Sequence, residues 1–550
     1  MSFLDENALL GSTWYEFERL ILRSLQHTGW EGLMFTSKSH DQGADIIGIP
    51  SGKDEAVVIQ CKHTGSNIVN RKGVEDLQRA CDFYETSQGI LATNAHLGST
   101  GRDRLKELSL HYKLLEWNFS KLTALGAGIA ETSLAKKTPR PYQQEAIYAI
   151  LDAIDSENRG LVMFATGLGK SIILAEIASF FCEEKKLPVL ILADKIPLVE
   201  QLEQSIWPQL SSGTATRLWD GNRKPSDFSG VTVATYQSVL SSLQAGNELP
   251  RFGAVLVDEC HHALAPRYQQ CLSLLEKDFL LGVTATPWRG DQGRITDLFG
   301  QPLATMGIVD GISQGFLADV EYEMFLDDVN WETVSNLTES HMTIRDLNSR
   351  LFLPSRDEDL CSKIVENWNA KNNPQTITFC KSIDHAERLA DLLSSMGMPS
   401  RAVHSRNMPQ AQKAKQLTDF RAKKFANLIG VDLLNEGVDV PDVAMVVFAR
   451  VTHSRRIFVQ QLGRGLRVTP KKKSVLVLDF VADIRRIAEG ARLNRERASC
   501  SQAEIYRGSG AEMVTFNSES HGNFVDEYLS DIADLEENDR VRLDFINSQN

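Results

Sequence analysis

The first 120 residues combine one amphipathic helix with several short apolar runs. Apolar side chains recur at helical spacing from Trp14 to His27, which predicts a helix there. Runs of four to six mostly apolar residues follow, and each predicts a strand: Ala44–Ile49, Ala56–Gln60, Gly89–Thr93 and Leu114–Trp117. The pattern predicts a small α/β domain over residues 1–120.

The pattern changes after residues 121–137, a stretch rich in small residues that predicts a linker, with a short helix as the alternative. From Thr138 onward, apolar runs alternate with helical spacing, which is typical of parallel sheets buried between helices. The first series of predicted strands is Gly160–Ala165, Val189–Ala193, Val231–Thr235, Ala254–Val257 and Leu280–Thr284. The second series is Gln375–Phe379, Asn427–Gly430, Met445–Ala449 and Ser474–Leu478.

Two series of strands predict two further α/β domains, divided between Phe316 and Ala370. We assign the first of these domains to residues 138–315 and the second to residues 370–498. Residues 316–369 form the connection between them. Residues 499–550 have weak periodicity and form an acidic C-terminal tail. The fold class expected is therefore α/β throughout.

Composition is that of a soluble globular protein: 42% of the 550 residues are hydrophobic and 24% are charged. No apolar run approaches the roughly 20 residues that a membrane-spanning helix needs, and the first residues lack the segments of a secretory signal. Eight cysteines without a CxxC pair indicate reduced thiols rather than disulfides or a zinc site. We expect a cytoplasmic protein without a membrane partner.

The net charge of −13 is unusual for a nucleic-acid-binding protein. More than half of the excess lies in the tail, where residues 512–550 carry ten acidic and two basic side chains. Whole-chain charge says little about a local cleft, so DNA binding stays open.

Residues 165–171, Ala-Thr-Gly-Leu-Gly-Lys-Ser, follow a predicted strand and precede a helical stretch. Such a loop turns backbone amides toward phosphate oxygens, so Thr166, Gly167 and Gly169 are candidate ATP contacts. Lys170 would reach the β- and γ-phosphates, and Ser171 would bind Mg²⁺. The match to the P-loop is imperfect, because Phe164 stands where the strict pattern has glycine.

Two carboxylates end the apolar strand before Cys260. Asp258 can hold Mg²⁺, and Glu259 can polarise the water that attacks the γ-phosphate. His261 and His262 are not favoured as a metal pair, because they lack the HExxH spacing and nearby ligands.

Residues 138–480 resemble superfamily 2 helicases, in the DEAD/DEAH-like group that contains type III restriction, UvrB and XPB ATPases. Motifs that occur in the family's order carry the resemblance: residues 140–143, 191–195, 233–237, 284–289, 378–381 and 435–439. It implies that Gln143 recognises adenine, that residues 191–195 and 233–237 contact DNA, and that residues 284–289 couple hydrolysis to movement. It also implies an ATP-sensing loop at Gly437 and Asp439.

The last motif of the resemblance is Gln460-Gln-Leu-Gly-Arg464-Gly-Leu-Arg467. In the family this element supplies arginines across the cleft between two RecA-like lobes. A guanidinium there can neutralise charge on the transferring phosphoryl group. Arg467 is the better candidate for this role, with Arg464 and Gln460 beside it.

A second candidate site lies near the N-terminus. Asp45 precedes Gln60 and Lys62 by 15 and 17 residues, so a hairpin of the two predicted strands brings the three together. Residues 10–118 thereby resemble the PD-(D/E)xK nuclease fold in its Mrr-type form, which uses this glutamine. The resemblance implies that Asp45 and Gln60 hold Mg²⁺ and that Lys62 orients or deprotonates the attacking water. Glu18 would supply a second carboxylate if the first helix packs across the sheet.

These observations predict an ATP-dependent DNA helicase or translocase with a fused Mg²⁺-dependent endonuclease that acts on duplex DNA. By family analogy we expect a role in prokaryotic restriction or anti-phage defence. One alternative is a DNA-repair helicase whose first domain binds DNA without cutting it. Another is an ATP-switched clamp or assembly protein, and the motor motifs alone would also fit an RNA motor.

Overall fold

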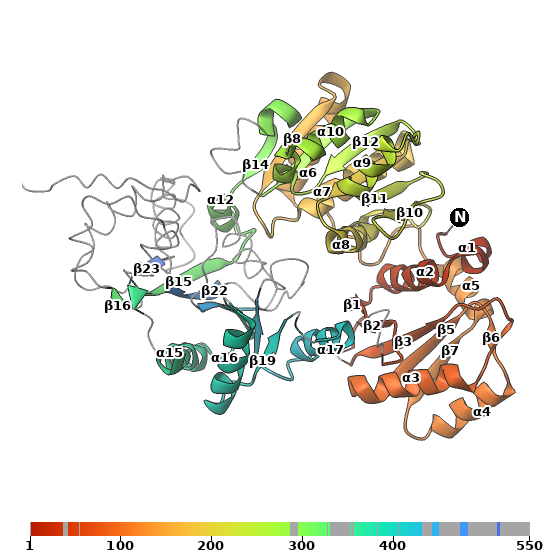
Figure 1. Cartoon of the computed structure of the whole chain (residues 1–550), viewed down its shortest axis with the longest axis horizontal. Coiled ribbons are helices and arrows are strands. Elements are labelled where there is room, and N and C mark those ends of the chain that lie inside the picture. The colour runs from red at the N-terminus through yellow and green to blue at the C-terminus, as the bar shows by residue number, and fades with distance from the viewer. Residues whose placement is uncertain are drawn as a thin grey trace, which may run out of the picture. The chain divides into compact units, whose positions relative to one another are not determined.

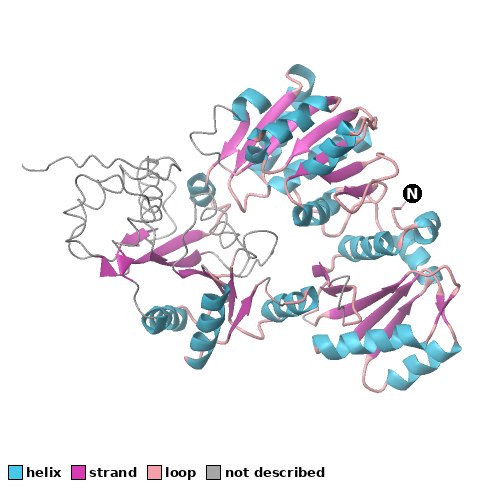
Figure 2. Ribbon diagram, viewed as in Figure 1, coloured by secondary structure: helices cyan, strands magenta, loops and turns pink. Residues whose placement is uncertain are grey.

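The computed structural model describes residues 2–36, 42–53, 55–285, 295–326, 328–329, 352–353, 357–380, 382–404, 406, 408–431, 443–449, 474–481 and 514–516. They divide into two compact units (Figures 1 and 2). Unit 1 comprises residues 1–164, 169–306 and 407–422, and unit 2 comprises residues 165–168, 307–406 and 423–550.

The N-terminal part of unit 1 is a five-stranded mixed sheet in the order β1-β2-β3-β5-β7. The first three strands pair antiparallel, and β3, β5 and β7 run parallel. The strands are β1 (Glu31–Phe35), β2 (Ile46–Ile49), β3 (Val57–Lys62), β5 (Gln88–Thr93) and β7 (Lys113–Trp117), with a separate pair β4 (Ile68–Val69) and β6 (His96–Leu97). The helices are α1 (Glu6–Gly11), α2 (Trp14–His27), α3 (Arg71–Tyr84), α4 (Ser99–Leu108) and α5 (Phe119–Gly128).

Helix α2 begins where the sequence predicts it. A capping box starts it, in which the Thr13 hydroxyl accepts from the Glu16 amide and the Glu16 carboxylate accepts from the Thr13 amide. One apolar face, with Phe17, Ile21 and Leu25, is fully buried against the sheet. Burial of this face holds α2 against the sheet, and this determines where the side chains on its other faces lie.

The stretch taken for a linker begins with a helix, the alternative kept open above. Helix α5 covers Phe119–Gly128, and its Leu122 is buried in the same core as α2. The N-terminal domain therefore extends into the predicted linker.

The rest of unit 1 is a seven-stranded parallel sheet in the order β10-β11-β9-β12-β13-β8-β14. Its strands are β8 (Arg159–Phe164), β9 (Val189–Ala193), β10 (Thr216–Trp219), β11 (Val231–Thr235), β12 (Phe252–Val257), β13 (Lys277–Thr284) and β14 (Pro302–Met306). The helical elements are α6 (Pro141–Ser156), α7 (Lys170–Ser179), η1 (Phe180–Glu184), α8 (Ile196–Ile206), η2 (Trp207–Gln209), α9 (Tyr236–Gln244), η3 (Cys260–Leu264) and α10 (Pro266–Leu274). We call this part lobe 1.

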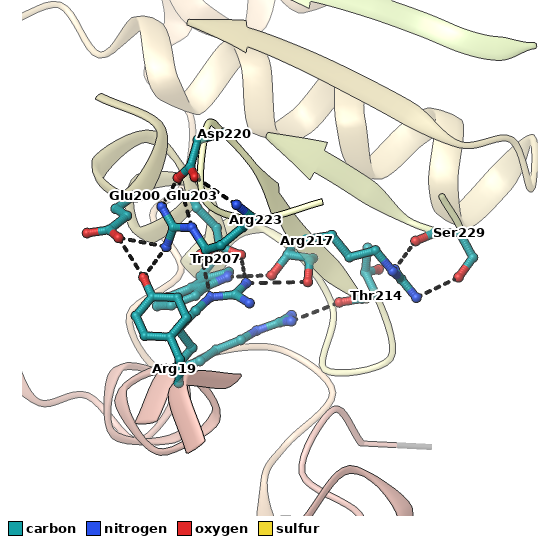
Figure 3. A network of polar contacts seen from close by, with 12 residues as sticks. Arg19, Glu200, Glu203, Trp207, Thr214, Arg217, Asp220, Arg223 and Ser229 are labelled. Carbon is teal, nitrogen blue, oxygen red and sulfur yellow. Dashed lines mark hydrogen bonds and ion pairs between the residues drawn. The ribbon is translucent and has the colours of Figure 1, made fainter. Parts of the chain in front are cut away.

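Polar side chains join the N-terminal domain to lobe 1 (Figure 3). Arg19 of α2 forms a two-contact ion pair with Glu203 of α8. Arg23, one turn later on α2, donates 2.9 Å to the carbonyl of Thr214 and 3.1 Å to that of Ser211. This face of α2 therefore packs against lobe 1.

An apolar contact accompanies these polar ones. Trp207, at the end of α8, is 1% exposed and belongs to the hydrophobic cluster that contains Phe17 and Leu22 of α2. Its indole nitrogen donates 2.9 Å to the Thr216 hydroxyl, which satisfies its polar group. Trp207 of lobe 1 consequently belongs to the hydrophobic core of the N-terminal domain.

Unit 2 contains a second seven-stranded sheet, in the order β19-β20-β18-β21-β22-β15-β23, in which every pair is parallel. Its strands are β15 (Asp319–Leu326), β18 (Thr376–Cys380), β19 (Ser400–Val403), β20 (Asn427–Gly430), β21 (Met445–Ala449), β22 (Ser474–Val481) and β23 (Val514–Phe516). Helices α12 (Ile308–Ser313), α15 (Asp357–Ala370) and α16 (Ile383–Ser395) and the pair β16 (Asp328–Val329) and β17 (Phe352–Leu353) complete its described part. Helix α17 (Gln410–Arg421) groups with unit 1.

The α/β fold class and the predicted strands are confirmed. Each predicted strand is present within three residues of its expected bounds. Strand β15 and helix α15 lie inside the range assigned to a connection, yet β15 pairs with β22 and α15 packs into the core of the second sheet. No helix in the part of the chain described is long and apolar enough to cross a membrane.

Candidate nucleotide site and nuclease site

The candidate phosphate loop connects β8 directly to α7. Gly167 and Gly169 have φ angles of +93° and +79°, which residues with a β-carbon rarely adopt. A β-carbon on Gly169 would also collide with the side-chain amide nitrogen of Gln143. The Thr166 hydroxyl is buried and has no hydrogen-bond partner among the described residues. A tight glycine loop with an unsatisfied donor before a helix N-terminus fits phosphate binding.

Lys170, the first residue of α7, points at the end of β12. Its ammonium nitrogen lies 3.3 Å from a carboxylate oxygen of Glu259 and 3.5 Å from the carbonyl of Phe164. Glu259 has a φ angle of +45°, a left-handed conformation that is uncommon for glutamate. The parallel strands thus bring together Lys170 and Glu259, which are far apart in the sequence.

The pKa values of the two carboxylates at the end of β12 are shifted in opposite directions. Burial raises the pKa of Asp258 above its usual value, and the charge of Glu259 raises it further. Burial would also raise the pKa of Glu259, but the Lys170 ammonium and His261 bring it below its usual value. Glu259 therefore stays ionised while Asp258 retains a proton more readily.

His261 links Glu259 to the end of β13. Its Nδ1 lies 2.9 Å from the Thr284 hydroxyl and 3.4 Å from a Glu259 carboxylate oxygen. Thr284 begins the motif that the helicase resemblance assigns to coupling. The spacing of His261 argued only against a metal pair, because its contacts with Thr284 and Glu259 depend on a strand order that spacing does not reveal.

The two candidate DNA-contacting motifs of lobe 1 lie side by side. Their strands β9 and β11 are parallel neighbours. The Gln237 side-chain nitrogen donates 3.1 Å to the Asp194 carbonyl. Lys195 is the N-cap of α8, the helix that holds α2 through Glu203.

Several predicted site residues lie outside the described part of the chain: Gly437, Asp439, Gln460, Arg464, Arg467, residues 286–289 and Lys381. Their roles remain predictions.

In the N-terminal domain, β2 and β3 form the predicted hairpin. The Asp45 amide donates 2.9 Å to the Ile59 carbonyl, just before the paired residues Ile46 and Ile59. The Asp45 carboxylate accepts from the Cys61 amide at 2.6 Å and from the side-chain nitrogen of Gln60. The hairpin therefore joins Asp45 and Gln60 directly, as the spacing predicts.

The Asp45 carboxylate and the Gln60 amide supply the oxygen atoms that a magnesium ion prefers, and the Gln60 nitrogen faces Asp45 in this structure. Mg²⁺ prefers oxygen ligands and is usually held by one or two carboxylates and several waters. Gln60 is 3% exposed, and its side-chain oxygen has no hydrogen-bond partner among the described residues. No cluster of three His, Cys, Asp or Glu side chains able to hold a metal occurs in the described ranges. Asp45 and Gln60 would therefore be the principal protein ligands.

Helix α2, which carries Glu18, packs on the face of the sheet that holds Ile59 and Cys61, opposite to the face from which Lys62 reaches α3. Burial raises the pKa of the Cys61 thiol well above its usual value, and the charges of Asp45 and Glu18 raise it further. Both carboxylates therefore lie near Cys61, between Gln60 and Lys62 on β3. Helix α2 crosses the end of β3, where the ring centroids of Phe17 and His63 are 5.4 Å apart.

The Lys62 ammonium is paired with an acidic residue that sequence analysis did not select. Its nitrogen lies 2.8 Å from a carboxylate oxygen of Asp76 on α3. Asp76 stands 14 residues after Lys62, and a lone acidic residue on a predicted helix carries no signal of this contact.

Comparison with protein families covers most of this architecture. Residues 9–118 match the Mrr-type model described as a restriction endonuclease. Residues 136–289 match the family of the type III restriction enzyme res subunit, and residues 356–469 match the helicase conserved C-terminal domain. The chain is a superfamily 2 helicase with an N-terminal Mrr-type restriction-endonuclease-like domain. Hereafter lobe 1 and the second sheet are called the helicase core.

Relatives of the helicase core include eukaryotic and bacterial proteins. A Schizosaccharomyces pombe protein named as a mitochondrial ATP-dependent helicase is 27% identical over 360 residues, which cover 64% of this chain and 58% of that protein. The endonuclease subunit of the Escherichia coli type I restriction enzyme EcoAI is 26% identical over 377 residues, covering 62% of this chain and 46% of the relative. The chain thus spans about half the length of these relatives.

A solved structure shares the fold over most of the chain. The type ISP restriction-modification enzyme LlaBIII bound to DNA superposes with a TM-score of 0.52 at 16% identity. The match covers 93% of this chain and 41% of the other.

Proposed function

We propose that the helicase core hydrolyses ATP to move along duplex DNA and that the Mrr-type domain cuts DNA in a Mg²⁺-dependent reaction. The observation that carries the nuclease half is the contact of the Asp45 carboxylate with the Gln60 side chain and the Cys61 amide. For the motor half it is the approach of Lys170 to Glu259 beside the glycine loop.

In the motor, each residue has a distinct role. Gln143 contacts adenine, backbone amides at Thr166, Gly167 and Gly169 cradle the phosphates, and Lys170 neutralises them. Ser171 and Asp258 hold the Mg²⁺ of the nucleotide, and Glu259 accepts a proton from the attacking water. The ionised state of Glu259 supports this last role. Gly437 and Asp439 sense the nucleotide, and Gln460, Arg464 and Arg467 complete the site from the second lobe.

In the nuclease, Asp45 and Gln60 would hold Mg²⁺, and Glu18 would supply a second carboxylate. Bound Mg²⁺ supplies charge stabilisation at the scissile phosphate and lowers the pKa of a water molecule. Lys62 orients that water and offsets the charge that develops on the phosphate. Rotating the Gln60 side-chain amide by half a turn would place its oxygen, instead of its nitrogen, beside Asp45. In that orientation the oxygen would serve as a metal ligand.

The role that we propose is prokaryotic restriction or anti-phage defence, in the cytoplasm. One relative is named as a restriction endonuclease subunit, and the enzyme that shares the fold was solved with DNA. The association of a motor with a nuclease-like domain in one chain agrees with such a system.

The test is incubation of purified protein with methylated and unmethylated plasmids, each with and without ATP and Mg²⁺. We expect DNA cleavage that requires Mg²⁺, together with DNA-stimulated ATP hydrolysis. Hydrolysis with strand separation but no cleavage under any condition would favour a repair helicase with a non-cleaving first domain. Hydrolysis without translocation or cleavage would favour a clamp.

A further inference from the structure

We propose that Asp76 is a positioning residue for Lys62, holding its ammonium group in place at the nuclease site. The inference rests on the proposed nuclease function, which it deepens by adding a residue that neither the sequence motif nor the family match assigns.

The contact itself is well defined. The Lys62 nitrogen and Asp76 carboxylate oxygen are 2.8 Å apart, and the side chains are 33% and 13% exposed. The second carboxylate oxygen of Asp76 accepts from Arg79 at 2.7 Å. Asp76 therefore has one oxygen for each cation, and Arg79, whose side chain is 57% exposed, does not share the oxygen that pairs with Lys62.

Helix α3 is a rigid platform for this carboxylate. Val74, Leu77 and Ala80 are fully buried in one hydrophobic cluster with Val58 of β3. The aliphatic part of Lys62 also lies beside Gly73 at the start of the helix, where a β-carbon would come within 3.8 Å of its Cγ. Helix α3 therefore restrains both the stem and the charged end of the lysine, since residues three apart share a helix face.

Asp76 also lies against the segment that leads to Asp45. Gly43 has a φ angle of +87°, and a β-carbon there would overlap the carbonyl oxygen of Asp76. The backbone of Asp76 thus supports the entry to the Asp45 strand while its side chain holds Lys62. Asp76 therefore lies against both the Lys62 side chain and the segment that precedes Asp45.

This connection has a chemical consequence. A lysine stem has four rotatable carbons, so an unrestrained ammonium would spend little time beside the scissile phosphate. The Asp76 ion pair limits that motion and leaves two ammonium protons for water or phosphate. Asp76 then affects the rate of cutting through Lys62, without touching DNA or metal itself.

The experiment compares single-turnover cleavage by the full-length protein and three variants. Asp76→Asn removes the charge but keeps the shape, Asp76→Glu keeps the charge, and Arg79→Met removes only the other partner of Asp76. Loss of a residue that orients a functional side chain typically costs about 10- to 100-fold in activity. We expect a loss of that order in Asp76→Asn, a smaller loss in Asp76→Glu, and little change in Arg79→Met.

Two further readouts separate positioning from other roles. The Mg²⁺ concentration for half-maximal cleavage and the DNA affinity should be unchanged in Asp76→Asn. A raised Mg²⁺ requirement would make Asp76 a metal ligand instead, and overturn the inference. Wild-type cleavage rates in Asp76→Asn, or equal losses in Asp76→Asn and Arg79→Met with lowered unfolding temperature, would also overturn it.

A measurement without DNA keeps the inference testable if the wild-type protein cuts nothing, a result that would count against the proposed nuclease itself. Brief acetylation followed by peptide mass spectrometry gives the modification rate of Lys62 relative to that of Lys72, an exposed lysine on α3. We expect the ratio to rise several-fold in Asp76→Asn and not in Arg79→Met. An unchanged ratio would show that Asp76 does not hold Lys62.

Discussion

Arg19 of the Mrr-type domain and Glu203 of the helicase core form an ion pair that is almost entirely buried. Their side chains are 11% and 1% exposed, and the Arg19 Nε lies 3.1 Å from a Glu203 oxygen (Figure 3). The same helix α8 begins at Lys195, within a candidate DNA-contacting motif. Helix α8 thus contacts α2 of the Mrr-type domain and also begins within a candidate DNA-contacting motif.

Removing one partner of this pair should destabilise unit 1 strongly. Arg19→Met leaves the Glu203 charge buried without compensation, which typically costs about 3–5 kcal/mol. The matched control is Arg217→Met, whose Asp227 partner is 53% exposed and whose loss should cost at most about 1 kcal/mol. Urea unfolding of the full chain measures both. The double variant Arg19→Met with Glu203→Leu should recover much of the loss, and equal effects of Arg19→Met and Arg217→Met would contradict the buried pair.

Acid should destabilise the same region through His27. Burial, together with the charge of Arg23, lowers the pKa of His27 to about 3. Between pH 6.5 and pH 3 the unfolded chain therefore binds a proton that the folded chain does not, so stability falls as the pH drops through this window. The slope for one proton is about 1.4 kcal/mol per pH unit. His27→Leu should show a shallower loss of unfolding temperature between pH 7 and pH 5 than wild type, and parallel curves would refute this assignment.

Two changes in lobe 1 should separate nucleotide binding from hydrolysis. Lys170→Ala removes a positive charge from the phosphates and should abolish ATP hydrolysis. Glu259→Gln should retain ATP binding while blocking hydrolysis, because only the water-polarising carboxylate changes. Steady-state ATPase and direct nucleotide binding measure the two effects, with the exposed Lys224→Ala as control. Near-normal turnover in Lys170→Ala would count against the phosphate loop.

The second-lobe arginines should act on turnover rather than on affinity. Arg467→Ala should reduce hydrolysis far more than ATP binding, because its partner charge develops in the transition state. Arginine fingers supplied in trans contribute about 10³ to 10⁵ in rate in some GTPases; we expect less here, since Arg464 partly substitutes. The double change should be worse than either alone in ATPase with saturating DNA. Unchanged turnover in the double variant would show that Gln460–Arg467 does not complete the ATP site.

The sequence predicted the buried strands well, because continuous apolar runs such as Val231–Thr235 reflect burial on both sheet faces. It missed β1 (Glu31–Phe35), which is mostly half-buried, and β10 (Thr216–Trp219), in which two polar residues precede the buried Leu218 and Trp219. Both are edge strands whose apolar runs are shorter than those of the buried central strands.

The hairpin partners Asp45 and Gln60 were predictable from their spacing, since a hairpin is a local structure. The contacts of Asp76 with Lys62 and of His261 with Thr284 depend on how helices and neighbouring strands pack. The docking of α2 on α8 through Arg19 joins segments more than 180 residues apart. Apolar periodicity specifies which face of α2 is buried but not the element that covers its polar face.

The most direct test of two separate active sites in one chain is to measure DNA cleavage and DNA-stimulated ATPase for Asp45→Ala on the same preparation. Asp45 contacts Gln60 and Cys61 at the five-stranded sheet of the N-terminal domain, whereas Lys170 begins α7 of lobe 1. We predict that cleavage is lost and ATPase is retained, with the exposed control Asp103→Asn unchanged in both. Persistent cleavage by folded Asp45→Ala, or loss of both activities, would contradict the account.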